Sequence, residues 1–396
     1  MWEIENLVGY RVYRGNREFL IRWKHFSSAD DTWEPFDKIS THHLLLDKFY
    51  RTQLAMTDKI VVPTHLGNNM HGMRNDDNVC YMNSILQCLS SHAPLASFFV
   101  KDMHEGKDDE KRIVPRFGMM IKSKWSEHDF SISAGFALKK SMRRHHPQFD
   151  NTDHQDAHEF CMALLDDLHE GLKQPPFPIM GDVEPKDVRG RAMTAWQKYQ
   201  AENNSIIFDL FYGQLCTMTE CGMCGLESVK FEVFDTLVVP IPAGATHLLQ
   251  CFDSLFAPVR VPEWECPNCK MHRGTTRTFI SRMPRTLVVS LKRFEMKGGV
   301  AHKIDTEIDF PLFDLDLRKW SLPSSAPKTS SYSLFAVCNH LGNVSRGHYT
   351  AFVKKPFSED WFLCNDKTVC GVDTIVEKNA YVLFYSEQQF FTIVDK

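Results

Sequence analysis

The sequence lacks the features of secreted and membrane-spanning proteins. Its first residues contain no basic segment followed by an apolar stretch, so we expect no signal peptide. No run approaches the roughly 18 apolar residues that a membrane span needs, so we expect no membrane insertion. The 12 cysteines are therefore expected in a reducing compartment. There, cysteine more often binds a metal or acts in catalysis than forms a disulfide.

An excess of positive charge is also absent. The chain has 46 Lys and Arg against 50 Asp and Glu, giving a net charge of −4. Such a balance argues against direct, sequence-specific nucleic-acid binding. At 396 residues, with 43% hydrophobic and 24% charged residues, the composition is that of a globular protein with two or three domains.

Cys80 stands between a polar turn and an amphipathic segment. Residues 75–78, Asn-Asp-Asp-Asn, favour a turn because their side chains bond to nearby backbone. After Cys80, the residues Ile85, Leu86 and Leu89 recur at helical spacing. A helix N-terminus favours a thiolate, because its unpaired N–H groups and dipole stabilise negative charge. From these residues alone, a nucleophile and a buried structural thiol are equal alternatives.

The same segment resembles the Cys box of the ubiquitin-specific proteases, a family of cysteine-type deubiquitinases. The matching residues are Gly72, Asn75, Asn78, Cys80, Tyr81, Met82, Asn83 and Ser84. The resemblance implies a papain-like thumb–palm–fingers domain that hydrolyses the bond after the ubiquitin C-terminus. It also implies that Cys80 is the nucleophile and that Asn75 is the oxyanion-hole asparagine.

Two later segments resemble further motifs of that family. Gly347-His348-Tyr349 resembles its His box, which implies that His348 is the catalytic base. The pair Asn365-Asp366 follows a predicted strand that begins at Trp361. In the family the first residue of this pair orients the imidazole and the second lends support. Together these residues form the Cys-His-Asn version of a catalytic triad.

A third family motif, Gln-Asp-Ala-His-Glu-Phe, is found within residues 153–169. These residues predict an amphipathic helix with Asp153 as its N-cap and with Phe160, Leu164 and Leu168 along one face. We expect this helix to pack and position other elements, and we assign it no catalytic role.

The Cys box departs from the family pattern at Asp76 and Asp77, where the family has Leu-Gly. Negative charge near a thiol disfavours the thiolate. The family's glycine also points to a backbone angle that aspartate adopts less easily. A second reading is therefore a catalytically impaired protein that binds ubiquitin and methylated lysine, and a third is a zinc-stabilised scaffold without affinity for ubiquitin. Activating subunits are a further candidate partner.

Two pairs of cysteines have the spacing of zinc ligands. Cys221 and Cys224 form one Cys-x-x-Cys pair, and Cys266 and Cys269 form the other. Four thiolates complete a closed tetrahedral site, so the expected role of the zinc ion is structural. Alternating apolar residues from Phe231 to Ile241 predict long strands next to the first pair. In the family such strands form the fingers that grip ubiquitin.

The N-terminal residues resemble a chromodomain, most clearly over residues 20–35. The resemblance implies a three-stranded sheet followed by a helix, and an aromatic cage for methylated lysine formed by Trp2, Trp23 and Phe26. The faces of aromatic rings attract cations, and a lysine ammonium keeps its charge when it is methylated. The alternative is that all three aromatic residues belong to the core.

We therefore predict a multidomain α+β protein. A chromodomain would occupy residues 1–55, a linker residues 56–71 and the protease domain residues 72–387. Within the protease domain we expect the thumb over residues 72–205, the fingers over residues 206–280 and the palm over residues 281–387. The expected partners are ubiquitin, ubiquitinated proteins including histones, and a methylated histone tail. The chromodomain also points to the nucleus, without excluding the cytoplasm.

Overall fold

The structure is a computed structural model that describes residues 3–13, 16–39, 45, 70–102, 104, 112–125, 131–176, 185, 187–323, 331–344, 346–356, 358–375 and 378–387. These residues fall into two compact units, one within residues 3–45 and the other within residues 70–387. Among them, no helix has both the length and the apolar character required to cross a membrane.

The first unit is a small antiparallel sheet. Its strands β1 (Ile4–Tyr13), β2 (Asn16–Trp23) and β3 (Thr32–Pro35) are hydrogen-bonded in the order β1-β2-β3. A 3₁₀ turn, η1 (Ser28–Asp30), precedes β3, and a short helix, α1 (Phe36–Ile39), follows it. The three-stranded sheet confirms the sequence prediction. The residues between this short helix and residue 70, where the expected C-terminal helix of the chromodomain would lie, are outside the described residues apart from Leu45.

Alternation along β2 builds the core of this unit. Phe19, Ile21 and Ile39 are fully buried and Leu7 is nearly so, and Trp23 packs partly buried against them. Beside this core, the guanidinium of Arg22 donates two partly buried hydrogen bonds to Asp31, of 2.5 and 2.7 Å. The sheet therefore has one apolar face, as its period of two predicts.

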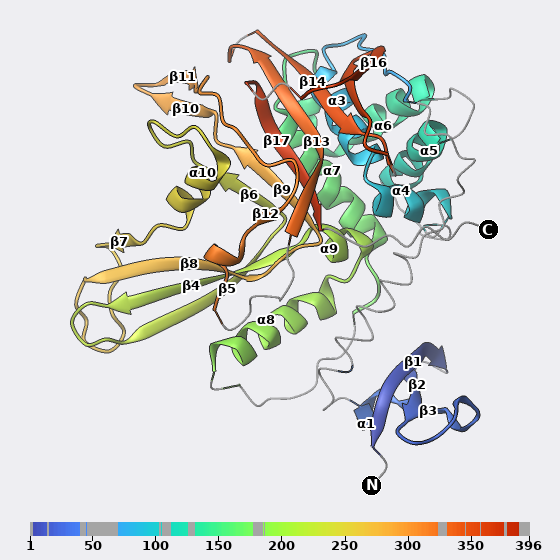
Figure 1. Ribbon diagram of the computed structural model, residues 1–396, viewed down its shortest axis with the longest axis vertical. Coiled ribbons are helices and arrows are strands. Elements are labelled where there is room, and N and C mark those ends of the chain that lie inside the picture. Colours follow the sequence, from blue (N-terminus) through green and yellow to red (C-terminus); the bar gives the residue numbers. More distant parts are fainter. Residues whose placement is uncertain are drawn as a thin grey trace. The chain divides into compact units, whose positions relative to one another are not determined.

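The second unit begins with a group of helices. They are α3 (Cys80–Ser90), α4 (Ala93–Val100), α5 (Ile113–Trp125), α6 (Ser131–His145), α7 (Ala157–Leu172), α8 (Val188–Glu202) and α9 (Ile206–Phe211), with the 3₁₀ turn η2 (Pro147–Phe149) between α6 and α7. Every residue of α3 is buried. This helix packs against α7 and against a strand of the large sheet, so it lies inside the unit (Figure 1).

Helix α7 begins three residues later than the sequence predicts. Its N-cap is Asp156, whose carboxylate accepts the backbone N–H groups of His158 and Glu159 at 2.7 and 3.0 Å. The same carboxylate also accepts the hydroxyl of Tyr381 at 2.7 Å. The predicted N-cap, Asp153, is therefore wrong, because Asp156 satisfies the free N–H groups and also ties the helix to a distant strand.

A mixed sheet of eight strands forms the centre of the second unit. Seven of the strands follow the order β16-β15-β14-β13-β17-β9-β6, and β12 pairs with β13. They are β6 (Thr236–Val239), β9 (Thr286–Leu291), β12 (Leu315–Asp316), β13 (Ser331–Gly342), β14 (Gly347–Lys354), β15 (Trp361–Asn365), β16 (Thr368–Val372) and β17 (Ala380–Glu387). Among the strand pairs that the structure describes in this sheet, β6–β9 alone is parallel.

Strand β17 shows how both faces of this sheet are buried. Val382 and Phe384 belong to the core that includes α3 and α7, whereas Leu383 and Tyr385 belong to a second core that includes α10 (Leu248–Leu255). The 3₁₀ turn η3 (Arg318–Trp320) borders this second core. Helices therefore cover both faces of the sheet, which accounts for the continuous apolar character of its central strands.

A second, four-stranded sheet projects from the helices and the large sheet (Figure 1). Its order is β5-β4-β8-β7, with β4 (Gly213–Cys221), β5 (Glu227–Phe234), β7 (Val259–Val261) and β8 (Gly274–Arg282). A short hairpin of β10 (Phe294–Lys297) and β11 (Val300–Lys303) is separate from it. The long strands next to the first cysteine pair confirm the sequence prediction.

Candidate active site

Helix α3 begins at Cys80, directly after the polar turn. Asn78 has a left-handed backbone with φ of 54°, and Val79 at the N-cap position has no side-chain cap. The backbone N–H of Val79 instead donates to Asn75 Oδ1 at 2.7 Å. The local prediction of a turn followed by a helix is therefore confirmed. The Cys80 thiol lies at the N-terminal end of this helix, where the dipole favours negative charge.

His348 and Asn365 come from neighbouring strands of the large sheet. His348 is the second residue of β14 and Asn365 is the last residue of β15, which pairs with β14 in antiparallel fashion. The ring Nε2 of His348 lies 2.8 Å from Asn365 Oδ1. With Nε2 engaged in this way, Nδ1 is the ring nitrogen left for a second partner.

The second partner of the imidazole is the thiol. A hydrogen bond with the Cys80 side chain is the main cause that raises the pKa of His348 to about 9, and the bond with Asn365 acts in the same direction. The structure thus brings together Cys80, His348 and Asn365, which are separated by as much as 285 residues along the chain. This arrangement has the connectivity that nucleophilic catalysis requires, from nucleophile to base to orienting group.

Asp366 connects the Cys box to the turn after β15. It has a left-handed backbone, with φ of 49°. Its carboxylate accepts the side-chain amides of Asn75 and Asn83 at 2.9 and 2.8 Å, and its backbone carbonyl accepts the N–H of Met73 at 2.8 Å. His348 Nε2 lies farther away, at 3.9 Å from Asp366 Oδ2. Asp366 therefore supports the Cys box more directly than it supports the imidazole.

Asn75 has one amide proton left for a substrate. Its NH₂ group has two donors, and one of them points at Asp366. The geometry agrees with a role for Asn75 as an oxyanion donor. This role stays a prediction, as do the catalytic roles of Cys80, His348 and Asn365. The sequence assigned no function to Asn83, although this residue matches the motif. The sequence also assigned no function to Gly72. A Cβ atom at this position would overlap the backbone carbonyl of Lys367.

The two aspartates that depart from the family pattern are both paired. Asp77 accepts a hydrogen bond from Lys139 on α6 at 3.0 Å, and this bond holds the pKa of its carboxyl below the usual range. Asp76 pairs with Arg74 at 3.0 Å. The expectation of a strained backbone at Asp77 is wrong, because the left-handed residue of this turn is Asn78. Each of the two carboxylates thus has a cationic partner, Lys139 for Asp77 and Arg74 for Asp76.

The four cysteines of the two Cys-x-x-Cys pairs meet at the end of the projecting sheet. Cys221 ends β4, and the second pair lies in the turn before β8. All four sulfur atoms lie within 4.8 Å of one another, with 3.6 Å between Cys221 and Cys269 and between Cys224 and Cys266. A zinc ion with Zn–S bonds of about 2.3 Å gives S···S separations of about 3.8 Å in a tetrahedron. The cysteines therefore form a zinc-binding site.

Backbone donors favour the thiolate form of the first cysteine pair. A hydrogen bond from the backbone of Leu226 is the main cause that lowers the pKa of Cys224 to about 6. The backbone of Cys224, followed by that of Met223, lowers the pKa of Cys221. The four ligands leave no position for water, so the ion would hold the turns together and would take no part in catalysis.

We expect one zinc ion per chain in the purified protein. The ion links two turns that approach each other only in the folded sheet, so its binding free energy stabilises that sheet. Metal analysis by mass spectrometry should give a zinc-to-protein ratio near one, and Cys266→Ser should lower it to near zero. As a matched control, Cys370→Ser changes an exposed cysteine outside the site and should leave the ratio unchanged. A folded chain without zinc would contradict the expectation.

The predicted aromatic cage lies in the first unit. Trp23 is half-buried at the end of β2 and its indole N–H donates to Thr32 at 3.0 Å. A backbone hydrogen bond of 3.2 Å from Phe26 to Trp23 closes the following turn, and Phe26 is 44% exposed. Trp2 lies outside the described residues. The turn therefore brings two of the three predicted residues to one end of β2, where Phe26 is partly exposed.

Comparisons with protein families match both units. The model of the ubiquitin carboxyl-terminal hydrolase family matches residues 71–385. The model of the Chromo, or chromatin organisation modifier, domain matches residues 2–52. The first range contains the proposed triad and the zinc ligands, and the second range contains Trp2, Trp23 and Phe26.

Several curated proteins resemble the chain over its larger unit. Ubiquitin carboxyl-terminal hydrolase 2 from Homo sapiens is 35% identical over 334 residues, which cover 79% of this chain and 54% of the relative. Ubiquitin carboxyl-terminal hydrolase Usp2 from Drosophila melanogaster is 32% identical over 329 residues, covering 79% of this chain and 34% of the relative. The chain thus spans about half of the human relative and about a third of the fly relative.

Solved structures share the fold. The SAGA DUB module Ubp8/Sgf11/Sus1/Sgf73 bound to ubiquitin aldehyde superposes with a TM-score of 0.66 at 22% identity, covering 87% of this chain and 76% of that chain. A yeast SAGA DUB module with a variant Sgf73 gives a TM-score of 0.66 at 23% identity, covering 84% and 72%. The family model covers most of the chain, and the human relative agrees with it. The chain therefore belongs to the ubiquitin carboxyl-terminal hydrolase family.

Proposed function

We propose that this chain is a cysteine-dependent deubiquitinase that hydrolyses the isopeptide or peptide bond at the ubiquitin C-terminus. The observation that carries the proposal is the contact of His348 with both Cys80 and Asn365 in a member of this family. The Cys80 sulfur would bond to the C-terminal carbonyl carbon of ubiquitin. The C–N bond to the substrate amine would then break, and a proton from the imidazolium would pass to the leaving nitrogen.

The other residues support this sequence of steps. The raised pKa of His348 keeps a proton on the imidazole at neutral pH, ready for the leaving amine. Asn75 would donate its second amide proton to the oxyanion. In the next step His348 would take a proton from water, and the resulting hydroxide would release the carboxylate of ubiquitin and the Cys80 thiol. Asn365 holds the ring in the orientation that both steps need.

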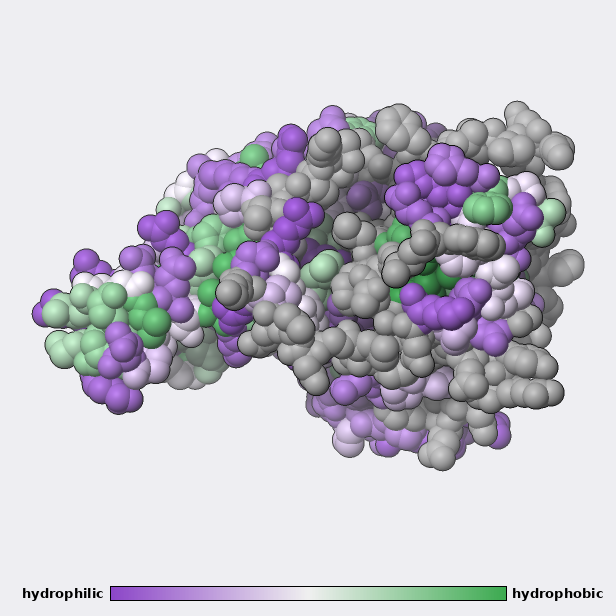
Figure 2. Space-filling view, turned by 90° about the horizontal axis from the view of Figure 1, so that it is seen from below, coloured by the Kyte–Doolittle hydropathy of each residue, from purple (hydrophilic) through white to green (hydrophobic). Residues whose placement is uncertain are grey.

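The projecting sheet offers a surface for the body of ubiquitin. Its zinc end and its edge strand β7 carry the exposed apolar residues Met223, Val259 and Met271. Figure 2 shows apolar and hydrophilic patches side by side over the projecting end at the left. A surface with apolar patches within a polar surround is typical of protein interfaces. Related modules have been solved with monoubiquitin and with ubiquitin aldehyde, which supports ubiquitin as the partner.

The test of this proposal is hydrolysis of ubiquitin that carries a C-terminal fluorogenic amide. The purified chain should release the fluorophore with saturation kinetics. Binding of ubiquitin without any release would instead support the reading in which the chain binds ubiquitin and does not cleave it. The pairing of Asp77 with Lys139 favours the enzyme, because the charge that prompted the second reading is balanced.

We further propose that the first unit binds methylated lysine and directs hydrolysis to ubiquitinated histones in the nucleus. The match to the Chromo domain and the partly exposed Phe26 beside the end of β2 support this proposal. A methylated ammonium keeps its charge and sheds water easily, so aromatic faces bind it well. Trp23 and Phe26, with Trp2, would supply these faces.

A histone-tail peptide with trimethyl-lysine should bind the full chain more tightly than the unmodified peptide in titration calorimetry. Phe26→Ala should weaken binding of the methylated peptide about tenfold, since one cation–π contact contributes about 1 to 2 kcal/mol. The matched control is Phe313→Ala, which removes a similarly exposed ring from the other unit. Equal affinity for the two peptides would exclude methyl-lysine recognition.

A further inference from the structure

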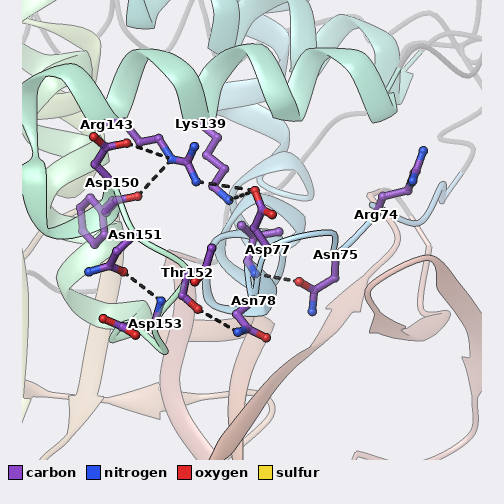
Figure 3. Close-up of polar contacts among 12 residues, drawn as sticks. Arg74, Asn75, Asp77, Asn78, Lys139, Arg143, Asp150, Asn151, Thr152 and Asp153 are labelled. Atoms are coloured by element: carbon purple, nitrogen blue, oxygen red, sulfur yellow. Dashed lines mark hydrogen bonds and ion pairs between the residues drawn. The ribbon is translucent and has the colours of Figure 1, made fainter.

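Asp77 forms an ion pair that the family's glycine could not make at this position. Its carboxylate oxygen Oδ2 lies 3.0 Å from Lys139 Nζ and 3.6 Å from Arg143 Nη2, both on helix α6 (Figure 3). Lys139 is only 4% exposed. Burial lowers its pKa, and the bond to Asp77 opposes this effect. A buried ammonium needs a partner, so this contact is a constrained part of the fold.

The ion pair belongs to a larger set of contacts around the same loop. Arg143 Nε lies 3.6 Å from Asp150 and donates to the carbonyl of Phe149 at 3.3 Å. One residue after Asp77, the Asn78 amide donates to the carbonyl of Thr152 at 2.8 Å. Figure 3 shows these contacts converging on the loop from α6 and from the segment after it. The loop is thus held at two adjacent residues from outside its own segment.

Apolar packing does not fill the space between the loop and α6. A cavity of about 270 Å³ lies there, and both Asp77 and Lys139 line it. Close packing normally fixes a loop against a helix. Here the ion pair joins the loop to α6 across the cavity, so it helps to fix the loop where close packing is missing.

The loop that is held in this way carries the catalytic groups. Asn75 and Val79 are joined by the 2.7 Å hydrogen bond that closes the turn, and Asp77 lies between them in the chain. Cys80 follows Val79 directly. A shift of Asp77 would therefore move the amide of Asn75 relative to the thiol.

We propose that Lys139 and Arg143 are positioning residues that act through Asp77 to hold Asn75 and Cys80 in the geometry required for hydrolysis. This inference rests on the proposed deubiquitinase function. Asp77 therefore supports the active site, although the sequence alone indicated that an aspartate in place of the family's glycine would impair it.

A double-mutant cycle tests the inference in the full chain. Asp77→Ala and Lys139→Met should each lower kcat on the fluorogenic ubiquitin substrate about tenfold and change KM by less than about twofold. The double variant should be no slower than Asp77→Ala alone, because Lys139 acts through Asp77 and has nothing left to hold once the carboxylate is gone. Multiplying losses would show independent roles, and a double variant with wild-type kcat would show that the single losses came from an unpaired charge. Either result overturns the proposal.

Asp76→Ala is the matched control. Asp76 is the adjacent aspartate, but it is exposed and its partner Arg74 lies on the same segment. This variant should keep kcat within about twofold of the wild-type value. A loss equal to that of Asp77→Ala would show that negative charge in the loop matters and that the tie to α6 does not.

A second measurement does not depend on turnover. Hydrogen exchange of the peptide that contains residues 75–80 should be faster in Asp77→Ala than in the wild type, and unchanged in Asp76→Ala. If the wild-type chain releases no fluorophore, the proposed function fails while exchange still reports on the loop. Unchanged exchange in Asp77→Ala would overturn the positioning role.

Discussion

Replacing Cys80 by alanine should lower the hydrolysis rate of a fluorogenic ubiquitin substrate by a factor of about 10⁶, the size of the loss when the nucleophile of a comparable triad is removed. Without the sulfur no acyl-enzyme can form. The remaining rate would come from His348 and Asn75 acting on a bound water molecule that attacks the carbonyl directly. Affinity for ubiquitin should stay within about twofold, because the projecting sheet would supply the binding contacts. Progress curves measure the first quantity, and titration calorimetry with free ubiquitin measures the second.

Two other cysteines serve as controls for this variant. Cys88 lies eight residues later on the same helix, where burial raises the pKa of its thiol well above the usual range. Cys370 is exposed on β16. Alanine at either position should leave kcat within about twofold of wild type. Retained hydrolysis in Cys80→Ala, or an equal loss in Cys370→Ala, would show that Cys80 is not the nucleophile.

The sequence could name the candidate triad but could not place it in space. The motifs identify Cys80, His348 and Asn365 because each stands in a characteristic local pattern. Their proximity depends on the packing of α3 against β14 and on the pairing of β14 with β15. Such contacts join distant segments, and no local pattern specifies them.

The roles of polar residues that act across the fold were the hardest to predict. Asp153 and Asp156 are both acceptable N-caps by residue type, and the bond from Tyr381 to Asp156 involves a strand 225 residues away. Similarly, Lys139 would be expected to face solvent on an amphipathic helix. It is buried instead, because Asp77 lies opposite it. A paired charge is recognised only when both partners are placed.

Asp366 should have the second-largest effect on activity. Asp366→Gly removes both acceptor contacts to Asn75 and Asn83, and glycine adopts the left-handed backbone of this position without strain. The amide of Asn75 would then lose its orientation, which amounts to the loss of an oxyanion donor. We expect kcat to fall about 10²-fold to 10³-fold, with KM nearly unchanged, because the donor acts on charge that develops in the transition state.

A set of variants at the same position separates hydrogen bonding from backbone strain. Asp366→Ala loses the same two bonds and adds the cost of a left-handed backbone, about 1 kcal/mol. Asp366→Asn tolerates that backbone and keeps one acceptor oxygen, so its kcat should lie between the values of wild type and Asp366→Gly. If strain alone mattered, Asp366→Gly would keep wild-type kcat and only Asp366→Ala would be impaired. If Asp366 acted mainly through the imidazole at 3.9 Å, all three variants would shift the pH profile of kcat/KM. Unshifted profiles with a lower kcat would place its action on Asn75.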